Sequence, residues 1–306
     1  MLIPDYVAID ALLVPHLHVD VRPVLESIAQ AACTDTGVIL VSDDPVSSAR
    51  FVQTCPVPEH LSVVAASPDT AWIRDLSPFP VVRDRRLYWL QPKPHAPDRE
   101  RDAALFQTIT RMPMEPVRYL MPRGNVVAGP RGLMLSTTRF FSDNELESSA
   151  NLDDLKQQLG VSSILFFSPL PMDSIAHADC YARFLSPTCL ALARVSDQPG
   201  FQETMNQLAD AVAARVPDLK VLWMPVRAGE DTIASPLNWI QLGTRLLVPD
   251  VPELPASEKA ELARSLGEAG FQVTWLPTPD IQAGGSLHCL TASIFAQCPE
   301  RSLLVR

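Results

Sequence analysis

Apolar residues along this chain switch between helical spacing and short uninterrupted runs, in an order that recurs about five times. In each recurrence a segment with helical spacing leads to a short apolar run and then to a proline. The predicted helices span 45–54, 99–111, 145–159, 201–215 and 258–269. The predicted strands span 61–65, 117–120, 164–167, 221–223 and 273–276, and they precede Pro68, Pro122, Pro169, Pro225 and Pro277.

A pair of β-rich runs around a turn follows each of these prolines. The pairs span 79–82 with 87–90, 126–128 with 133–136, 181–185 with 189–195, 239–241 with 246–248, and 290–296 with 303–305. The repeating unit is therefore ββαβ. One unit cannot bury its own apolar face, so we expect about five of them to pack around a pseudo-fivefold axis, with corresponding loops at one end.

The remaining N-terminal segment is expected to complete this ring. A helix at 23–32 and a strand at 38–41 are placed to close it with the C-terminal hairpin. No change in composition marks a second domain, so we predict a single domain over 1–306.

Composition narrows the class of protein and of partner. The chain has 306 residues, of which 47% are hydrophobic, as in a soluble globular protein. Its net charge of -10 and isoelectric point near 5.0 argue against nucleic acid or an anionic membrane as partner. The same charge is compatible with a small cationic substrate, and it does not exclude assembly into a homo-oligomer.

The cellular setting follows from the termini and the cysteines. The N-terminus has no basic region and contains Asp5 and Asp10, so we expect no secretory signal. No apolar run approaches the length of a membrane span. The six cysteines include no CxxC pair and are sparse for a disulfide framework, so a reducing cytoplasm is the simplest location.

The predicted ring would gather five polar residues from corresponding loops in one central site: Asp75, Asn125, His177, Asn238 and Cys289. Cys289 follows the flexible run Gly284-Gly285-Ser286-Leu287-His288, where a substrate can pass close to the backbone. Thiols are intrinsically nucleophilic, so Cys289 is a candidate for covalent catalysis. The alternative is a small buried hydrophobic residue.

His177 is the predicted proton donor and acceptor for Cys289. On an extended strand, the spacing His177-x-Asp179 would put both side chains on one face. The alternative is a core histidine satisfied by a local carboxylate. By the same alternation we expect His288 to be structural and Cys180 to point away from the site and to be inert.

Two carboxylates suit a planar cation. Asp75 and Asp179 could hold a guanidinium through paired N–H bonds, and Trp72 could stack on it. The alternative for Asp75 is a surface pair with Arg74 or a turn cap. We expect no bound metal, because neither His16-x-His18 nor His177-x-Asp179 has a third ligand at a zinc-like spacing. We also expect no nucleotide cofactor, because the sequence has no phosphate-binding loop.

Several motifs together resemble one family. They are Trp72-Ile73-Arg74-Asp75, Gly124-Asn125 with Gly129-Pro130-Arg131-Gly132 and Leu135-Ser136-Thr137-Thr138, His177-Ala178-Asp179 with Ala182-Arg183-Phe184, Asn238 with Leu246-Leu247-Val248-Pro249, and 284–291. In this order the chain is similar to the agmatine deiminase and bacterial-type peptidylarginine deiminase family of the guanidine-modifying pentein superfamily.

The resemblance implies a five-bladed α/β propeller and a hydrolase that needs no cofactor. It implies that Cys289 attacks the guanidinium carbon while Asp75 and Asp179 clamp the nitrogens. His177 would protonate the departing ammonia and then activate the water that releases a covalent thiouronium as a ureido product. Asn238, Asn125, Gly124 and Gly285 would line the site.

The chain departs from the family pattern at three positions. Arg123 and Ala176 stand where the family usually has glycine, and Lys93 is the single basic residue of Gln91-Pro92-Lys93-Pro94. Arg123 pointing inward would repel a distal ammonium and favour a substrate carboxylate, as Lys93 would. Pointing outward, Arg123 would be a solvated surface charge.

The leading hypothesis is a cytoplasmic deiminase of agmatine or a related arginine derivative. Alternatives are a peptidylarginine deiminase acting on C-terminal or internal arginine, an amidinotransferase, and a non-catalytic pentein that binds a partner. A Cys-His-Asp peptidase is disfavoured, because two carboxylates facing the substrate would oppose the oxyanion that peptide hydrolysis must stabilise.

Overall fold

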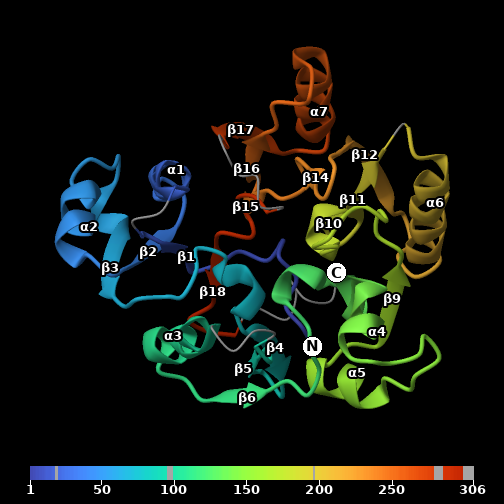
Figure 1. Ribbon diagram of the computed structural model, residues 1–306, viewed down its shortest axis with the longest axis horizontal. Coiled ribbons are helices and arrows are strands. Elements are labelled where there is room, and N and C mark those ends of the chain that lie inside the picture. Colours follow the sequence, from blue (N-terminus) through green and yellow to red (C-terminus); the bar gives the residue numbers. More distant parts are fainter. Residues whose placement is uncertain (18–19, 95–98, 196, 279–284, 299–306) are drawn as a thin grey trace.

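Five sheets of three or four strands lie around the middle of the molecule in Figure 1. The computed structural model describes residues 1–17, 20–94, 99–195, 197–278 and 285–298. In four of the sheets, the first strand pairs antiparallel with the second, and the second pairs parallel with the third. Because a parallel connection needs a long crossover, the helix of each unit lies between its second and third strands.

These four sheets have the following strands. They are β4 (Phe79–Arg83), β5 (Arg86–Gln91) and β6 (Met114–Pro116); β7 (Val127–Ala128), β8 (Leu133–Thr137) and β9 (Ser163–Phe167); β10 (Ala182–Ser186), β11 (Cys189–Arg194) and β12 (Lys220–Pro225); and β15 (Ile240–Leu242), β16 (Arg245–Asp250) and β17 (Gln272–Pro277). The four ββαβ units predicted for this part of the chain are confirmed.

The fifth sheet joins the two ends of the chain. Its order is β18 (Ala292–Ile294), β1 (Ala11–Pro15), β2 (Gly37–Ser42) and β3 (Leu61–Ala65). β18 pairs antiparallel with β1, in a register that aligns Leu12 with Ser293. The N-terminal segment thus joins the C-terminal strand in one sheet, as expected, but the partner of this strand is β1. The predicted strand at 303–305 lies outside the described residues.

Five helices of the described residues match the predicted positions closely. The described residues form the helices α1 (Arg22–Ala32), α2 (Pro45–Val52), α3 (Glu100–Thr110), α4 (Arg139–Asp143), α5 (Asp153–Leu159), α6 (Pro199–Ala213) and α7 (Ala256–Glu268). The five that match are α1, α2, α3, α6 and α7. Proline at the first turn begins α2 and α6, and the Asp44 carboxylate caps α2 by accepting from Ser47 N–H at 3.1 Å. α5 ends at Gly160, whose φ of +64° suits glycine.

Two predicted boundaries were wrong. The strand predicted at 117–120 lies earlier in the chain, as β6 at Met114–Pro116. The pattern missed it because the residues of β6 are partly exposed and do not form an apolar run. Pro116 is tolerated there, since β6 is the edge strand of its sheet. Of the helix predicted at 145–159 only the second half is helical, as α5, and α4 lies before the predicted span.

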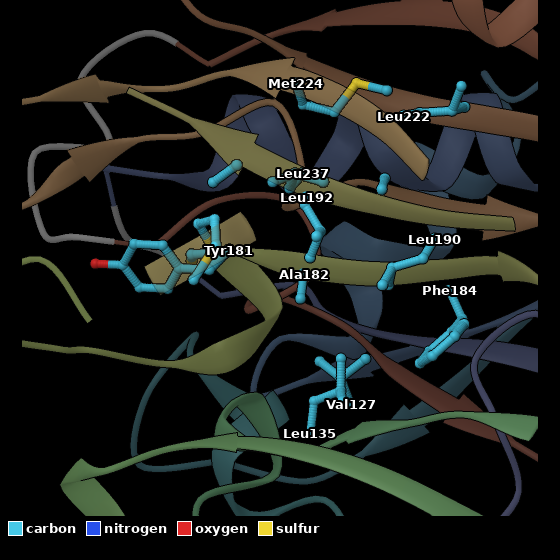
Figure 2. Packing of buried hydrophobic residues seen from close by; sticks show 14 of the residues in the cluster. Val127, Leu135, Tyr181, Ala182, Phe184, Leu190, Leu192, Leu222, Met224 and Leu237 are labelled. Atoms are coloured by element: carbon cyan, nitrogen blue, oxygen red, sulfur yellow. The ribbon is translucent and has the colours of Figure 1, made fainter. Parts of the chain in front are cut away.

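The largest hydrophobic core lies between β10, β11 and α6. Figure 2 shows Tyr181, Leu190 and Leu192 of this core with Met224 of β12. Leu190 and Leu192 are fully buried, which contributes about 1.5–3 kcal/mol to stability for each side chain.

Among the described residues, no helix is both long and apolar enough to cross a membrane.

Short 3-10 turns lead from one sheet to the next and meet in the middle of the molecule. The turn Ile73–Leu76 precedes β4, Arg123–Asn125 precedes β7, and Ala178–Cys180 precedes β10. The second of these turns packs against both of the others. The equivalence of the repeats therefore brings together chemical groups that lie far apart in the sequence.

Candidate functional site

The side chain of Asn238 fixes the position of Cys289. Its Nδ2 lies 3.2 Å from the Cys289 sulfur. Its Oδ1 accepts the backbone N–H groups of His288 at 3.0 Å and of Cys289 at 3.3 Å. Both residues are buried. One amide thus orients the thiol and the backbone that carries it.

Gly285 and Trp72 flank Cys289. A β-carbon at Gly285 would lie 2.5 Å from the Trp72 ring and 3.2 Å from the Cys289 β-carbon, so a side chain there would displace one or both. The backbone N–H of Arg74 donates to the Cys289 carbonyl at 3.2 Å. The turn that carries Asp75 is therefore tied directly to the cysteine.

His177 and Asp75 form a second group, next to Gly124. His177 Nδ1 lies 3.3 Å from Asp75 Oδ1. The other oxygen, Asp75 Oδ2, lies 3.7 Å from Arg99 Nη1, and Arg99 also donates to the Trp72 carbonyl at 2.5 Å. Sequence reasoning missed Arg99, because it precedes α3 and belongs to no motif that signals a site.

Asp179 is fully buried and is held by His288. Its Oδ2 lies 2.6 Å from His288 Nδ1. Burial raises the pKa of Asp179, against the effect of His177 and Arg183. Burial, together with the nearby Arg183 and Arg74, lowers the pKa of His288 well below its usual range. His288 is therefore a neutral imidazole in contact with the carboxyl group, and Arg74 Nε lies 3.2 Å from the same Nδ1.

Asp5 brings a buried carboxylate from the N-terminal segment beneath this site. Around it lie Arg123 at 3.2 Å, His288 at 3.5 Å, Arg74 at 3.7 Å and Arg183 at 3.8 Å. Burial acts to raise the pKa of Asp5, but the arginines hold it below its ordinary value. No local pattern indicates this role of Asp5, because its partners lie far along the chain.

Arg123 is buried, so it is not a solvated surface charge. Its side chain is 3% exposed, it pairs with Asp5, and it lies over the Phe79 ring at 5.5 Å. Burial lowers its pKa to about 10. Arg74 is likewise buried, so it makes no surface pair with Asp75. Lys93 is exposed on the loop after β5.

Asn125 holds the turn that carries Asp179. Its Oδ1 accepts from the Thr137 N–H at 3.0 Å, from the Thr137 hydroxyl at 2.9 Å and from the Ala178 N–H at 3.2 Å. Its side chain is 1% exposed. The structure thus gives Asn125 and Asn238 parallel roles, each bracing a turn through its amide oxygen.

Alternation along a strand was the wrong model for two segments. Ala178–Cys180 is a 3-10 turn and 287–290 is also a turn, so neighbouring side chains do not face opposite ways. Cys180 was expected to point away from the site, yet its sulfur lies 3.3 Å from Asn238 Nδ2, the same nitrogen that contacts Cys289. His288 is buried, as a structural residue should be, and contacts Asp179 directly.

A cavity of about 650 Å³ is lined by residues that neighbour Cys289. Cys180, Asn238 and Gly285 line it, together with residues of the β13 (Arg227–Ala228) and β14 (Ile233–Ala234) hairpin. Three exposed acidic residues also line it: Glu230, Asp231 and Glu253. Among the described lining residues the one basic residue is Arg227, which pairs with Glu258 at 2.5 Å. The described wall of this cavity is therefore negatively charged.

The other histidine motif has local partners. His16 Nδ1 lies 2.6 Å from the Ser48 hydroxyl, and His16 Nε2 lies 3.1 Å from Glu26. His18 lies outside the described residues. Within the ranges that the structure covers, no group of three His, Cys, Asp or Glu residues is arranged to hold a metal ion.

One family model matches most of the chain. The model of the Porphyromonas-type peptidyl-arginine deiminases covers residues 11–294. No curated protein matches the sequence.

Solved structures share the fold at low sequence identity. An agmatine deiminase from C. jejuni is 18% identical with a TM-score of 0.81, and the match covers 97% of this chain and 96% of that one. An agmatine deiminase from Enterococcus faecalis is 15% identical with a TM-score of 0.75, covering 95% and 94%. DDAH from Pseudomonas aeruginosa is 12% identical with a TM-score of 0.55, covering 94% and 100%. The fold is thus a mixed α/β fold of the kind found in these proteins.

Proposed function

Because the chain belongs to the Porphyromonas-type peptidyl-arginine deiminase family, whose members are hydrolases of amidine C–N bonds, we propose that it is a cysteine-dependent deiminase of agmatine or a related arginine derivative. The guanidinium becomes a ureido group and ammonia leaves. Cys289 is the nucleophile, His177 the general acid and base, and Asp75 with Asp179 the clamp.

A pair of buried carboxylate oxygens carries this proposal. Within the described parts of the chain, neither Asp75 Oδ1 nor Asp179 Oδ1 receives a hydrogen bond, and the nearest charged group to Asp75 Oδ1 that forms an ion pair with it is His177 at 3.3 Å. An unpaired buried acceptor costs about 1–3 kcal/mol, and more when it is charged. A planar guanidinium carries five N–H donors and suits two such acceptors, while its charge favours the ionised form of Asp179.

Holding the cation also holds its carbon for attack. The Cys289 sulfur, oriented by Asn238, adds to the guanidinium carbon and gives a tetrahedral adduct. His177, beside Asp75, gives a proton to the departing nitrogen, and ammonia leaves behind an S-linked thiouronium. His177 then takes a proton from a water that attacks the same carbon. The C–S bond breaks, and the ureido product and the Cys289 thiolate separate.

The cavity supports a substrate with a second positive charge. Its exposed Glu230, Asp231 and Glu253 would attract a distal ammonium such as that of agmatine. Arg123 does not oppose this charge, because it is buried against Asp5. The family's description favours peptidyl arginine as the second candidate.

The remaining proposals concern architecture and setting. Four sheets of one plan and a fifth that joins the two chain ends, spread around the middle of the molecule in Figure 1, support a five-bladed α/β propeller forming one catalytic domain. The repeats would be its blades. We place the enzyme in the cytoplasm, on the sequence features already given.

The test is an ammonia-release panel with the full-length chain. The substrates are agmatine, arginine, and peptides with internal or C-terminal arginine. We expect agmatine to be turned over best, Cys289→Ala to abolish turnover, and Asp75→Asn and Asp179→Asn to lower both rate and affinity. Cys189→Ala is the matched control, because Cys189 is buried in β11. No ammonia or ureido product from any substrate, or near-normal activity in all three site variants, would refute the proposal.

A further inference from the structure

Cys180 is a second thiol beside Cys289 that the proposed reaction does not use. It ends the turn that carries Asp179, and it lines the cavity. Asn238 Nδ2 lies 3.3 Å from the Cys180 sulfur and 3.2 Å from the Cys289 sulfur. One amide nitrogen therefore sits within contact distance of both sulfur atoms, which come from segments more than a hundred residues apart.

The two thiols also affect each other's ionisation. The neighbouring Cys289, together with burial, raises the pKa of Cys180 well above its usual range. The Cys180 thiol is thus protonated in the reduced protein. The two residues have similarly small exposed fractions, 5% for Cys180 and 7% for Cys289. The cavity gives a small oxidant a path to Cys180 and its surroundings.

We infer that Cys180 and Cys289 form a reversible disulfide when the protein meets hydrogen peroxide, and that this bond protects the nucleophile from irreversible oxidation. The inference uses the proposed function only for the reactivity of Cys289. It assigns Cys180 the part of a resolving thiol, the second cysteine that converts a sulfenic acid to a disulfide.

The chemistry balances in two steps. The Cys289 thiolate attacks one peroxide oxygen, the O–O bond breaks, and hydroxide leaves and is protonated to water, so that Cys289 becomes a sulfenic acid. The Cys180 sulfur then loses its proton and attacks the Cys289 sulfur. The S–O bond breaks, and a second hydroxide leaves and takes up that proton as water. Each sulfur has lost one electron, and both electrons have reduced the peroxide.

The reduced protein already holds the two sulfur atoms on one shared contact. A disulfide needs the sulfur atoms at about 2.05 Å, and two sulfur atoms that each lie within 3.3 Å of Asn238 Nδ2 can approach this distance by side-chain rotation. With the nucleophile in the disulfide, turnover stops until a dithiol reduces the bond. Without Cys180, the sulfenic acid would remain open to further peroxide and pass to the sulfinic acid, which dithiols do not reduce.

The test treats the full-length wild-type chain and two variants with hydrogen peroxide and then with dithiothreitol. Cys180→Ser removes the resolving thiol. Cys189→Ser is the matched control, because it removes a buried cysteine of β11. Peptide mass spectrometry without reduction detects a linked Cys180–Cys289 peptide independently of activity. Ammonia release is expressed as the fraction of each variant's own starting rate, so a direct effect of Cys180→Ser on the rate does not enter.

We expect wild type and Cys189→Ser to give the linked peptide and to recover most of their activity on reduction. Cys180→Ser should give Cys289 sulfinic acid and recover less than a tenth. If Cys180→Ser does not fold, as judged by circular dichroism, Cys180→Ala takes its place. Absence of the linked peptide in oxidised wild type would overturn the inference, as would equal recovery in the Cys180 variant. Mass spectrometry detects the linked peptide whether or not the chain releases ammonia. Failure of this inference can therefore be distinguished from failure of the proposed function.

Discussion

The α-carbon of Gly124 faces the imidazole of His177 so closely that a β-carbon there would lie 2.7 Å from His177 Nδ1. The same β-carbon would lie 3.1 Å from Asp75 Oδ1. Gly124 therefore keeps the histidine and the carboxylate together, and any side chain would separate them from each other or from the substrate.

Replacing Gly124 by alanine should lower kcat/KM for agmatine about 100-fold, because a displacement of about 1 Å in a catalytic group has an effect of this size. Steady-state ammonia release measures it. Gly200→Ala is the control, since a β-carbon there meets nothing within 4 Å. Wild-type kinetics in Gly124→Ala would show that His177 and Asp75 need not be so close.

The repeating fold could be predicted from the sequence because its signals are local. Apolar spacing predicted α6 and α7, and paired β-rich runs predicted the hairpin of β10 and β11. Prediction failed where the signal was weak, as at β6, whose residues Met114–Pro116 are partly exposed and include a proline.

The site was predictable only in part, because its contacts depend on long-range geometry. The equivalence of positions in the repeats correctly predicted that Asp75 lies near His177 and that Asn238 lies near Cys289. Alternation failed for Cys180, since its backbone forms a 3-10 turn. No local pattern could pair Asp5 with Arg123, which lies 118 positions away.

Asp5 provides a prediction on stability. Asp5→Asn leaves Arg74, Arg123 and Arg183 buried without their carboxylate, so the free energy of unfolding should fall by about 3–5 kcal/mol. Urea unfolding at pH 7 measures this. Asp43→Asn is the control, because Asp43 is exposed. A loss as small as that of the control would contradict a supporting role for the ion cluster.

The same variant predicts a pH dependence. The pKa of Asp5 is below its ordinary value in the folded protein, so its stabilisation is complete above about pH 4 and is lost as the pH falls through the folded-state value. The difference in unfolding free energy between wild type and Asp5→Asn should therefore shrink in acid. A difference that stays constant from pH 6 down to acid unfolding would argue against an ionised Asp5.

Ala176 provides a test of backbone strain. Its φ of +55° lies in the left-handed region, where a β-carbon costs about 1–2 kcal/mol. Ala178 is also buried, and it lies in the adjacent turn, where φ is not positive. Replacing either by glycine loses one buried methyl group and adds chain entropy. Ala176→Gly should therefore cost about 1–2 kcal/mol less than Ala178→Gly in chemical unfolding, and equal costs would mean that Ala176 is unstrained.

Asn238 separates the positioning of the nucleophile from its electrostatics. Asn238→Asp keeps an oxygen for the backbone N–H groups of His288 and Cys289 but replaces the donor, 3.2 Å from the sulfur, with a negative charge. A like charge at this distance disfavours the thiolate, so the acid limb of the kcat/KM profile should move up by about one to three pH units. Asn238→Ala, which removes both functions, should lower kcat at every pH. Asn206→Asp adds the same charge on the exposed face of α6 and should leave the profile in place. A profile for Asn238→Asp that overlays the wild-type curve would mean that Asn238 braces the turn without acting on the sulfur.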